Sequence, residues 1–180
     1  MTAVVSACRA VPILAEHVLP APVGEVHDLF LDSDFLCAYA HATLAGRSLV
    51  TVSPDRLRTS LRRVQPTDSA PPFLAPVIGP EVDIVEVVRW DAPGPGQWGR
   101  RALLRVEALV APREARFTGV MTLEPASEDA QAAAACRWTV DGGLWVKASL
   151  IGGKVAPLLT DAVQTALATQ ARLAGEWLRR

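Results

Sequence analysis

The sequence predicts an α+β fold in which an antiparallel sheet of about six to seven strands is followed by one long C-terminal helix. Residues 44 to about 143 alternate apolar and polar side chains with a period of two, which is typical of strands. Residues 154–178 carry an apolar stripe at helical spacing. Two short helical patterns stand between the first strand and the alternating region.

The first strand is expected at residues 10–19, AVPILAEHVL. Pro22 follows in the turn PAP and fits the first turn of a helix, because its missing N–H has no intrahelical partner there. The apolar residues of this helix are Val23, Val26, Leu29 and Phe30. Asp32 and Ser33 are capping residues for a second short helix. Its apolar residues are Phe35, Leu36, Tyr39 and Ala40.

Strand patterns then follow one another as far as about residue 143. The clearest, at 98–110, places Ala102 and Leu104 on one face and Arg101 and Arg105 on the other. The other alternating segments are 49–52, 57–64, 82–90, 115–123 and 133–140. Proline- and glycine-rich turns separate them, and such short connections predict an antiparallel meander.

A helix from about 154 to 178 closes the chain. Its buried stripe is predicted to be Ala156, Leu159, Val163, Leu167, Gln170, Ala174 and Trp177. Pro157 fits only the first turn, so Gly152 and Gly153 are expected just outside the helix, as a hinge after the last strand. The other interpretation, a phosphate-binding loop around Lys154, lacks the first glycine and the hydroxyl residue of G-x-x-x-x-G-K-[ST].

Composition and charge fit one domain over residues 1–180, with a flexible N-terminus at 1–9. Half of the residues are hydrophobic and 21% are charged, which is ample for a core. The formal net charge of -1 argues against a nucleic-acid partner, which usually requires a basic face. No apolar run reaches the ~18 residues of a membrane-spanning helix, so no integral membrane segment is expected.

Cysteine and histidine spacing indicates no metal site. Cys8, Cys37 and Cys136 lie far apart without a CxxC motif, so neither zinc nor a disulfide framework is expected. The three histidines form no H-x₃-H pair, and packing is the preferred interpretation of His27. We therefore expect reduced thiols, a cytoplasmic protein and no cofactor.

Three segments are similar to a known superfamily. HVLPAPVGEVHDLFLDSDFL at 17–36 is similar to the opening strand, Ala-Pro turn and helix of START-related proteins. SLIGGKVAPLL at 149–159, before a helix ending in GEWL, and PPFL at 71–74 resemble a bacterial family of uncharacterised proteins within it. From about residue 10 to 178, the chain thus resembles the helix-grip superfamily, also called SRPBCC or Bet v 1-like. The resemblance implies a curved sheet wrapped around the last helix, a cavity between them and a lipophilic ligand; it carries over no catalytic residue.

Glu86 is the most informative candidate for the wall of that cavity. It shares one face of the strand at 82–90 with apolar residues, and burial would raise the pKa of its carboxyl group. The alternation leaves a second possibility open, in which the neighbouring valines point inward and Glu86 is solvated. Tyr39 and Cys136 are either pocket residues or ordinary core residues. The expected lining is Glu86, Tyr39, Leu104, Phe117, Met121, Cys136, Trp138, Leu159 and Val163.

The connection at 65–80 holds five prolines among several apolar residues. A long loop of this kind is often functional, and a lid over the cavity is one interpretation. A rigid loop packed on the sheet edge is the other, favoured by the proline content.

These features predict a carrier or sensor that binds a hydrophobic, lipid- or polyketide-like molecule. Small residues on the gripping surfaces, such as Ala108, Ala115 and Ala156, would leave room for it, although they could instead allow close packing. The alternative function is an enzyme of the cyclase or dehydratase type, which needs an acid or base inside the cavity. Glu86 and Tyr39 are its only candidates. A protein-binding role with a closed cavity is a third, weaker interpretation.

Overall fold

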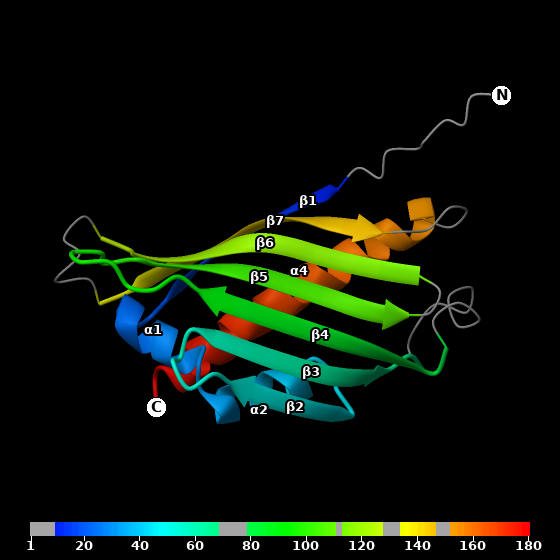
Figure 1. Ribbon diagram of the computed structural model, residues 1–180, viewed down its shortest axis with the longest axis horizontal. Coiled ribbons are helices and arrows are strands. Elements are labelled where there is room, and N and C mark those ends of the chain that lie inside the picture. The colour runs from blue at the N-terminus through cyan, green and yellow to red at the C-terminus, as the bar shows by residue number, and fades with distance from the viewer. Residues whose placement is uncertain (1–9, 69–78, 111–112, 128–133, 147–151) are drawn as a thin grey trace.

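The computed structural model describes residues 10–68, 79–110, 113–127, 134–146 and 152–180. It confirms the α+β class and the helix-grip arrangement, with a seven-stranded antiparallel sheet in the order β1-β7-β6-β5-β4-β3-β2 (Figure 1). The strands are β1 (Val11–Leu19), β2 (Arg47–Val52), β3 (Arg58–Pro66), β4 (Glu81–Trp90), β5 (Arg100–Val110), β6 (Arg113–Pro125) and β7 (Cys136–Val146). The predicted loop at 65–80 falls largely outside the described residues, as does the N-terminus at 1–9.

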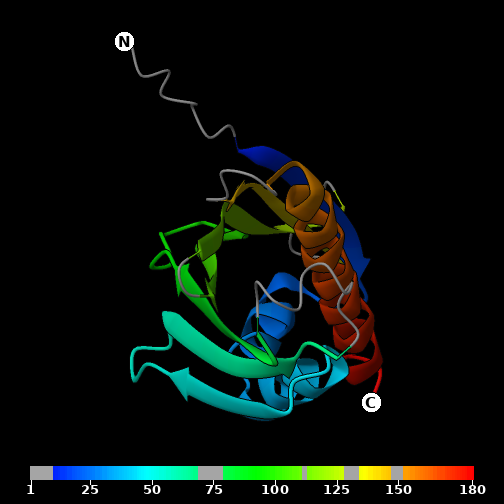
Figure 2. The same cartoon turned by 90° about the vertical axis from the view of Figure 1, so that its right-hand side faces the viewer.

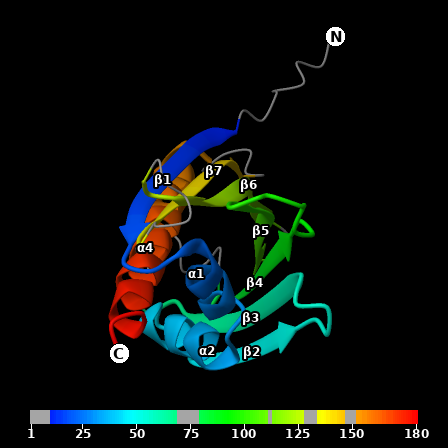
Figure 3. The same cartoon turned by 90° about the vertical axis from the view of Figure 1, so that its left-hand side faces the viewer.

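Two short helices, α1 (Val23–Leu29) and α2 (Ser33–Ala42), follow β1 as predicted. Asp32 caps α2, because its Oδ1 accepts a hydrogen bond of 2.8 Å from the Phe35 backbone N–H. The helices close one end of the curved sheet, where α1 lies within the arc of strands (Figure 3).

The last helix, α4 (Gly152–Trp177), begins two residues earlier than predicted. The expected boundary was wrong: Gly152 and Gly153 lie within the first turn, and Pro157 lies inside the helix. A proline at this position removes only the hydrogen bond to residue 153, and a 26-residue helix stabilised by tertiary packing tolerates that loss. The hinge role of the two glycines stays a prediction.

The sheet forms an arc from β1 to β2, and α4 lies across its concave side (Figures 2 and 3). The helix packs on β1 and β7 at one margin and on α2 at the other. Pairing of β1 with β7 brings the first and last strands together, and their inward side chains join the main apolar core, beside which Tyr39, Ala40, Ala45 and Leu61 form a smaller second cluster.

Register arranges the inward-facing side chains in rows that cross the sheet. One row consists of Thr59, Val88, Leu104, Gly119, Gly142 and Ile13. Two glycines face each other in this row, and the tip of the Phe117 ring rests against both: a Cβ on Gly142 would lie 2.7 Å from Phe117 Cζ, and one on Gly119 would lie 3.1 Å from it. The glycine pair therefore provides the space in which the Phe117 ring lies.

The packed end is the part of the interior beside α1, and it is filled by Phe30, Phe35, Trp90, Trp138 and Trp177. Ring centroids lie 5.2 Å apart for Phe30 and Trp138 and 5.7 Å apart for Phe35 and Trp177. Edge-on contacts of this kind stabilise beyond the apolar area they bury. His27 joins them edge-on to Trp90 at 4.7 Å, which confirms the packing interpretation of this histidine.

Candidate functional site

Beyond Phe117, away from the packed end, the sheet and α4 enclose a cavity of about 460 Å³. Small side chains account for it: Ala108 pairs with both Ile84 and Ala115 across the sheet, and α4 contributes Ala162 and Ala166. The inward positions of β5 and β6 at this end are alanines, whereas inward positions elsewhere in the sheet carry tryptophan or phenylalanine. The space is therefore built into the sequence of the strands and helix.

The cavity opens to solvent between the end of α2 and α4. Leu44, after α2, lines it and is 69% exposed. Asp161 and Thr165 on α4 also line it and are exposed, whereas Leu167 further along the helix is buried. The cavity volume is within the ~300–1,000 Å³ usual for small-molecule sites. The opening gives a small molecule access to it.

The structure brings together six of the nine residues expected to line the cavity: Tyr39, Glu86, Leu104, Phe117, Leu159 and Val163. It places Met121, Cys136 and Trp138 in the packed end, away from the cavity lining. All three point inward as the alternation predicted, but at the ends of β6 and β7 that lie in the packed end. Burial raises the pKa of Cys136 to about 11, so this thiol is protonated at neutral pH.

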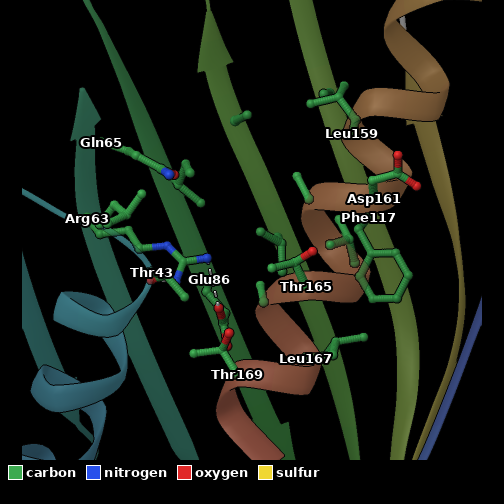
Figure 4. A pocket seen from close by; sticks show the side chains of 18 of the residues that line it. Thr43, Arg63, Gln65, Glu86, Phe117, Leu159, Asp161, Thr165, Leu167 and Thr169 are labelled. Atoms are coloured by element: carbon green, nitrogen blue, oxygen red, sulfur yellow. Dashed lines mark hydrogen bonds and ion pairs between the residues drawn. The ribbon is translucent and has the colours of Figure 1, made fainter. Parts of the chain in front are cut away.

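Glu86 belongs to a group of four polar residues on the cavity wall, the polar cluster, which consists of the buried Tyr39, Arg63 and Glu86 and the half-buried Thr43. Of the two orientations that the alternation allowed for this strand, the structure has the one in which Glu86 points inward, and the residue is 6% exposed. Arg63 is 5% exposed, and its side chain points toward Glu86 (Figure 4). The distance from Arg63 Nη2 to Glu86 Oε2 is 3.8 Å, longer than a hydrogen bond.

The fold places these two residues as diagonal neighbours on one face of the sheet. Leu61 pairs with Glu86 and Arg63 pairs with Ile84. Arg63 therefore lies diagonally opposite Glu86, displaced by two residues along the neighbouring strand. The end of α2 covers them. The Thr43 hydroxyl accepts a hydrogen bond of 2.7 Å from Arg63 Nη1. The same hydroxyl donates to the backbone carbonyls of Tyr39 and Ala40 in α2.

Several partial negative charges stabilise the buried guanidinium. The carbonyl end of α2 lies beside it, and the Arg63 Cζ stands 5.1 Å from the centre of the Tyr39 ring. One donor still lacks a partner: among the described atoms, Arg63 Nε is buried without a hydrogen bond. A buried donor in this condition is costly, more so on a charged group.

Burial also controls the protonation of the cluster. It raises the pKa of Glu86, against the opposing effects of Arg63 and of a hydrogen bond with Tyr39. Burial and the Glu86 carboxylate raise the pKa of Tyr39 as well, so its hydroxyl stays protonated. The wall thus presents a fixed cation, a phenol and a carboxyl group that resists ionisation.

Arg63 and Thr43 were not predicted from the sequence. The adjacent pair Arg62 and Arg63 carried the signal, because in an alternating strand one of two neighbouring arginines must point inward. Leu57 and Leu61 mark the odd-numbered face of this strand as the buried one, which selects Arg63. Arg62 points outward and forms an ion pair with Asp83.

Neither a metal centre nor a membrane span is found in the described part of the chain. No three His, Cys, Asp or Glu side chains there gather closely enough to hold a metal ion. No helix among the described residues is both long and apolar enough to cross a bilayer.

Fold and cavity together define a helix-grip protein with an internal cavity. The family described as protein of unknown function DUF2505 matches residues 15–178, and the chain belongs to it. No curated protein matches the sequence.

Solved structures share this fold at low sequence identity. The Zhui aromatase/cyclase of Streptomyces sp. R1128 is 10% identical, with 96% of this chain and 95% of that chain covered and a TM-score of 0.64. A START superfamily protein of Mycobacterium smegmatis is 11% identical over 93% and 97%, with a TM-score of 0.51. The lipid transfer and protein localization domain of human StarD13 is 13% identical over 91% and 74%, with a TM-score of 0.50.

Proposed function

We propose that this protein binds a hydrophobic small molecule, lipid- or polyketide-like, in the cavity between the sheet and α4. The observation that carries the proposal is the cavity of about 460 Å³, whose wall is mostly apolar, with the polar cluster on one side and Asp161 and Thr165 on α4. Leu104, Phe117 and Val163 offer it an apolar surface, and burial of matching apolar area is the main source of affinity in such sites.

The similar structures support this proposal in kind. One is named as a lipid transfer domain and another as an aromatase/cyclase, so the same fold serves molecules with large apolar parts in both. For this protein we propose carriage or sensing, in the cytoplasm and without a nucleic-acid partner. The free thiols of Cys37 and Cys136 fit a reducing compartment.

Native mass spectrometry of gently purified protein, followed by titration with Nile red, tests the proposal. We expect a co-purified apolar molecule, or saturable Nile red binding at one site. Ala108→Phe places a ring in the cavity and should weaken this binding by at least about tenfold, since a filled pocket excludes the dye. The matched control is Leu109→Phe, on the neighbouring residue that points outward and is 52% exposed.

Equal Nile red affinity in both variants would place the dye elsewhere and contradict the proposal. Loss of binding in Ala108→Phe alone, with the unfolding temperatures of both variants close to that of the wild type, would support it.

A second candidate function, an enzyme of the cyclase or dehydratase type, rests on the polar cluster. Glu86 and Tyr39 are both protonatable groups on the wall of the cavity, and a buried carboxyl group whose pKa is raised is better suited to act as a proton donor than an exposed one. Glu86→Gln should abolish turnover of a substrate while ligand binding persists. Turnover unchanged by this substitution would remove Glu86 from such a role.

A further inference from the structure

We propose that the ligand carries a hydrogen-bond-accepting oxygen, as a carboxylate or a carbonyl, which binds the guanidinium of Arg63, while its apolar body fills the cavity. This inference rests on the proposed function and adds the chemistry and the orientation of the ligand. Arg63 is a wall residue of the cavity, and among the described atoms its Nε has no partner. Arg63 is only 5% exposed, so bulk water does not replace the missing acceptor.

The acceptors around Arg63 are Thr43, Glu86 and the Tyr39 hydroxyl, and none of them accepts a hydrogen bond from Nε. Thr43 is held at the end of α2 by contacts of 3.1 Å and 3.0 Å with the Tyr39 and Ala40 carbonyls, and it already accepts from Nη1. Glu86 stands 3.8 Å from Nη2, and it also hydrogen-bonds Tyr39. Arg63 therefore lines the cavity with one donor, Nε, to which no described protein atom is a hydrogen-bond acceptor.

The chemistry of the guanidinium selects the head group of the ligand. A guanidinium offers only N–H donors, so its complement is an oxygen with lone pairs. An ammonium group offers donors alone and would meet the Arg63 cation at close range, which is unfavourable. Oxygen acceptors on a charged donor form the stronger class of hydrogen bond, and a carboxylate matches the guanidinium in shape.

The position of Arg63 also sets the direction of the ligand. The polar cluster occupies the side formed by β3, β4 and α2, while Phe117 on β6 and Leu159 on α4 lie on the other side, where α4 also carries Asp161 and Thr165 (Figure 4). A molecule with its oxygen at Arg63 thus extends across the sheet toward β6 and α4. This orientation places its apolar part against the alanines that create the space.

A series of probes with equal chains and different head groups tests the inference on the wild-type protein. The probes are decanoate, methyl decanoate and decylamine, each measured by displacement of bound Nile red. We expect both oxygen-bearing probes to displace the dye at about tenfold lower concentration than decylamine, because only they provide an acceptor for Arg63. Comparison of decanoate with its ester distinguishes a carboxylate ligand from a carbonyl ligand.

Arg63→Met should remove this preference, leaving the three probes within about threefold of each other, since a thioether offers no N–H donor. Arg62→Met is the matched control, on the adjacent residue that points outward, and it should keep the wild-type preference. If Arg63→Met fails to fold, the head-group series on the wild type still decides.

Equal displacement by all three probes in the wild type would overturn the inference and leave the proposed function standing. A preference that survives in folded Arg63→Met would overturn it as well. Failure of the proposed function gives a different result: no probe displaces Nile red, and Ala108→Phe binds the dye as the wild type does.

Discussion

The two ends of the interior lie under the same sheet and against the same helix, yet one is filled and the other is hollow. At the packed end, Trp138 meets Phe30, which stacks on Phe35, and Trp90 meets His27 of α1. At the cavity end, Ala108 and Ala115 pair with each other on β5 and β6. The backbone geometry is continuous between them, so the size of the inward side chains decides which part of a helix-grip fold becomes a binding site.

The two ends also differ in charge. In the described part of the chain, the packed end buries apolar and aromatic groups, whereas the cavity end buries Arg63 and Glu86 without a close ion pair. Burying charge in this way contributes little to stability, and a loosely satisfied pair is costly. We infer that the packed end supplies most of the stability and that the cavity end gives up stability for recognition.

Trp138→Ala tests the packed end most strongly. The side chain is 1% exposed, so its removal should lower the free energy of unfolding by about 3–5 kcal/mol, through lost burial and the void left behind. Urea unfolding followed by circular dichroism measures the change. A loss below about 1 kcal/mol would show that the core relaxes around the void and that the packed end does not dominate stability.

Gly142→Ala tests the boundary between the two ends. Its Cβ would collide with the Thr118 carbonyl oxygen and would lie 2.7 Å from both Gly119 Cα and Phe117 Cζ. Overpacking of this kind should cost about 1–3 kcal/mol and push the Phe117 ring into the cavity, weakening Nile red binding.

Gly24→Ala is the control for that substitution. Gly24 lies in α1, and beyond its own helical turn no atom comes within 4 Å of the position that a Cβ would take. Alanine there should therefore stabilise the protein by about 0.5–1 kcal/mol through helix propensity. Changes of the same sign at both glycines would contradict a specific role for the glycine pair.

The contrast between the two ends also shows how far the sequence could predict this molecule. Alternation and helical spacing correctly predicted the element order and the inward faces of the strands at 98–110, 115–123 and 133–140, because periods of 2 and 3.6 are local properties of the chain. They could not tell the two ends apart. Cys136 and Trp138 have the same orientation as Phe117, and only the pairing register shows that they lie at the packed end.

The polar cluster was half predictable for a related reason. Glu86 stood out as a charge within an apolar strand, although its direction stayed open until the sheet was seen to bury that face. Arg63 required a partner strand and the end of α2, elements separated from it in sequence. Contacts between distant segments determine such a site, and no local pattern encodes them.

Glu86→Gln sharpens the comparison through pH. Because the folded-state pKa of Glu86 is raised, the folded protein holds a proton that the unfolded chain releases above the ordinary value of 4.5. Wild-type stability should therefore fall, relative to Glu86→Gln, as pH rises from about 4.5 through the raised pKa, by about 1.4 kcal/mol for each unit by which the pKa is raised. The measurement is the difference in unfolding free energy between the two proteins across that range. A difference independent of pH would mean that Glu86 ionises as easily in the fold as in water.

The last comparison concerns α4, which crosses both ends. Leu159 lines the cavity and Leu173, further along α4, packs on the filled interior; both are partly buried. Leu159→Ala should cost about 1 kcal/mol, because a side chain facing empty space has few contacts to lose. Leu173→Ala should cost about 2–3 kcal/mol, nearer the usual value for a leucine in a filled core. Urea unfolding of the two variants gives the comparison, and Leu159→Ala should in addition accept bulkier probes than the wild type. Equal losses at the two positions would show that α4 closes onto the sheet in solution, so that the cavity end is as well packed as the other.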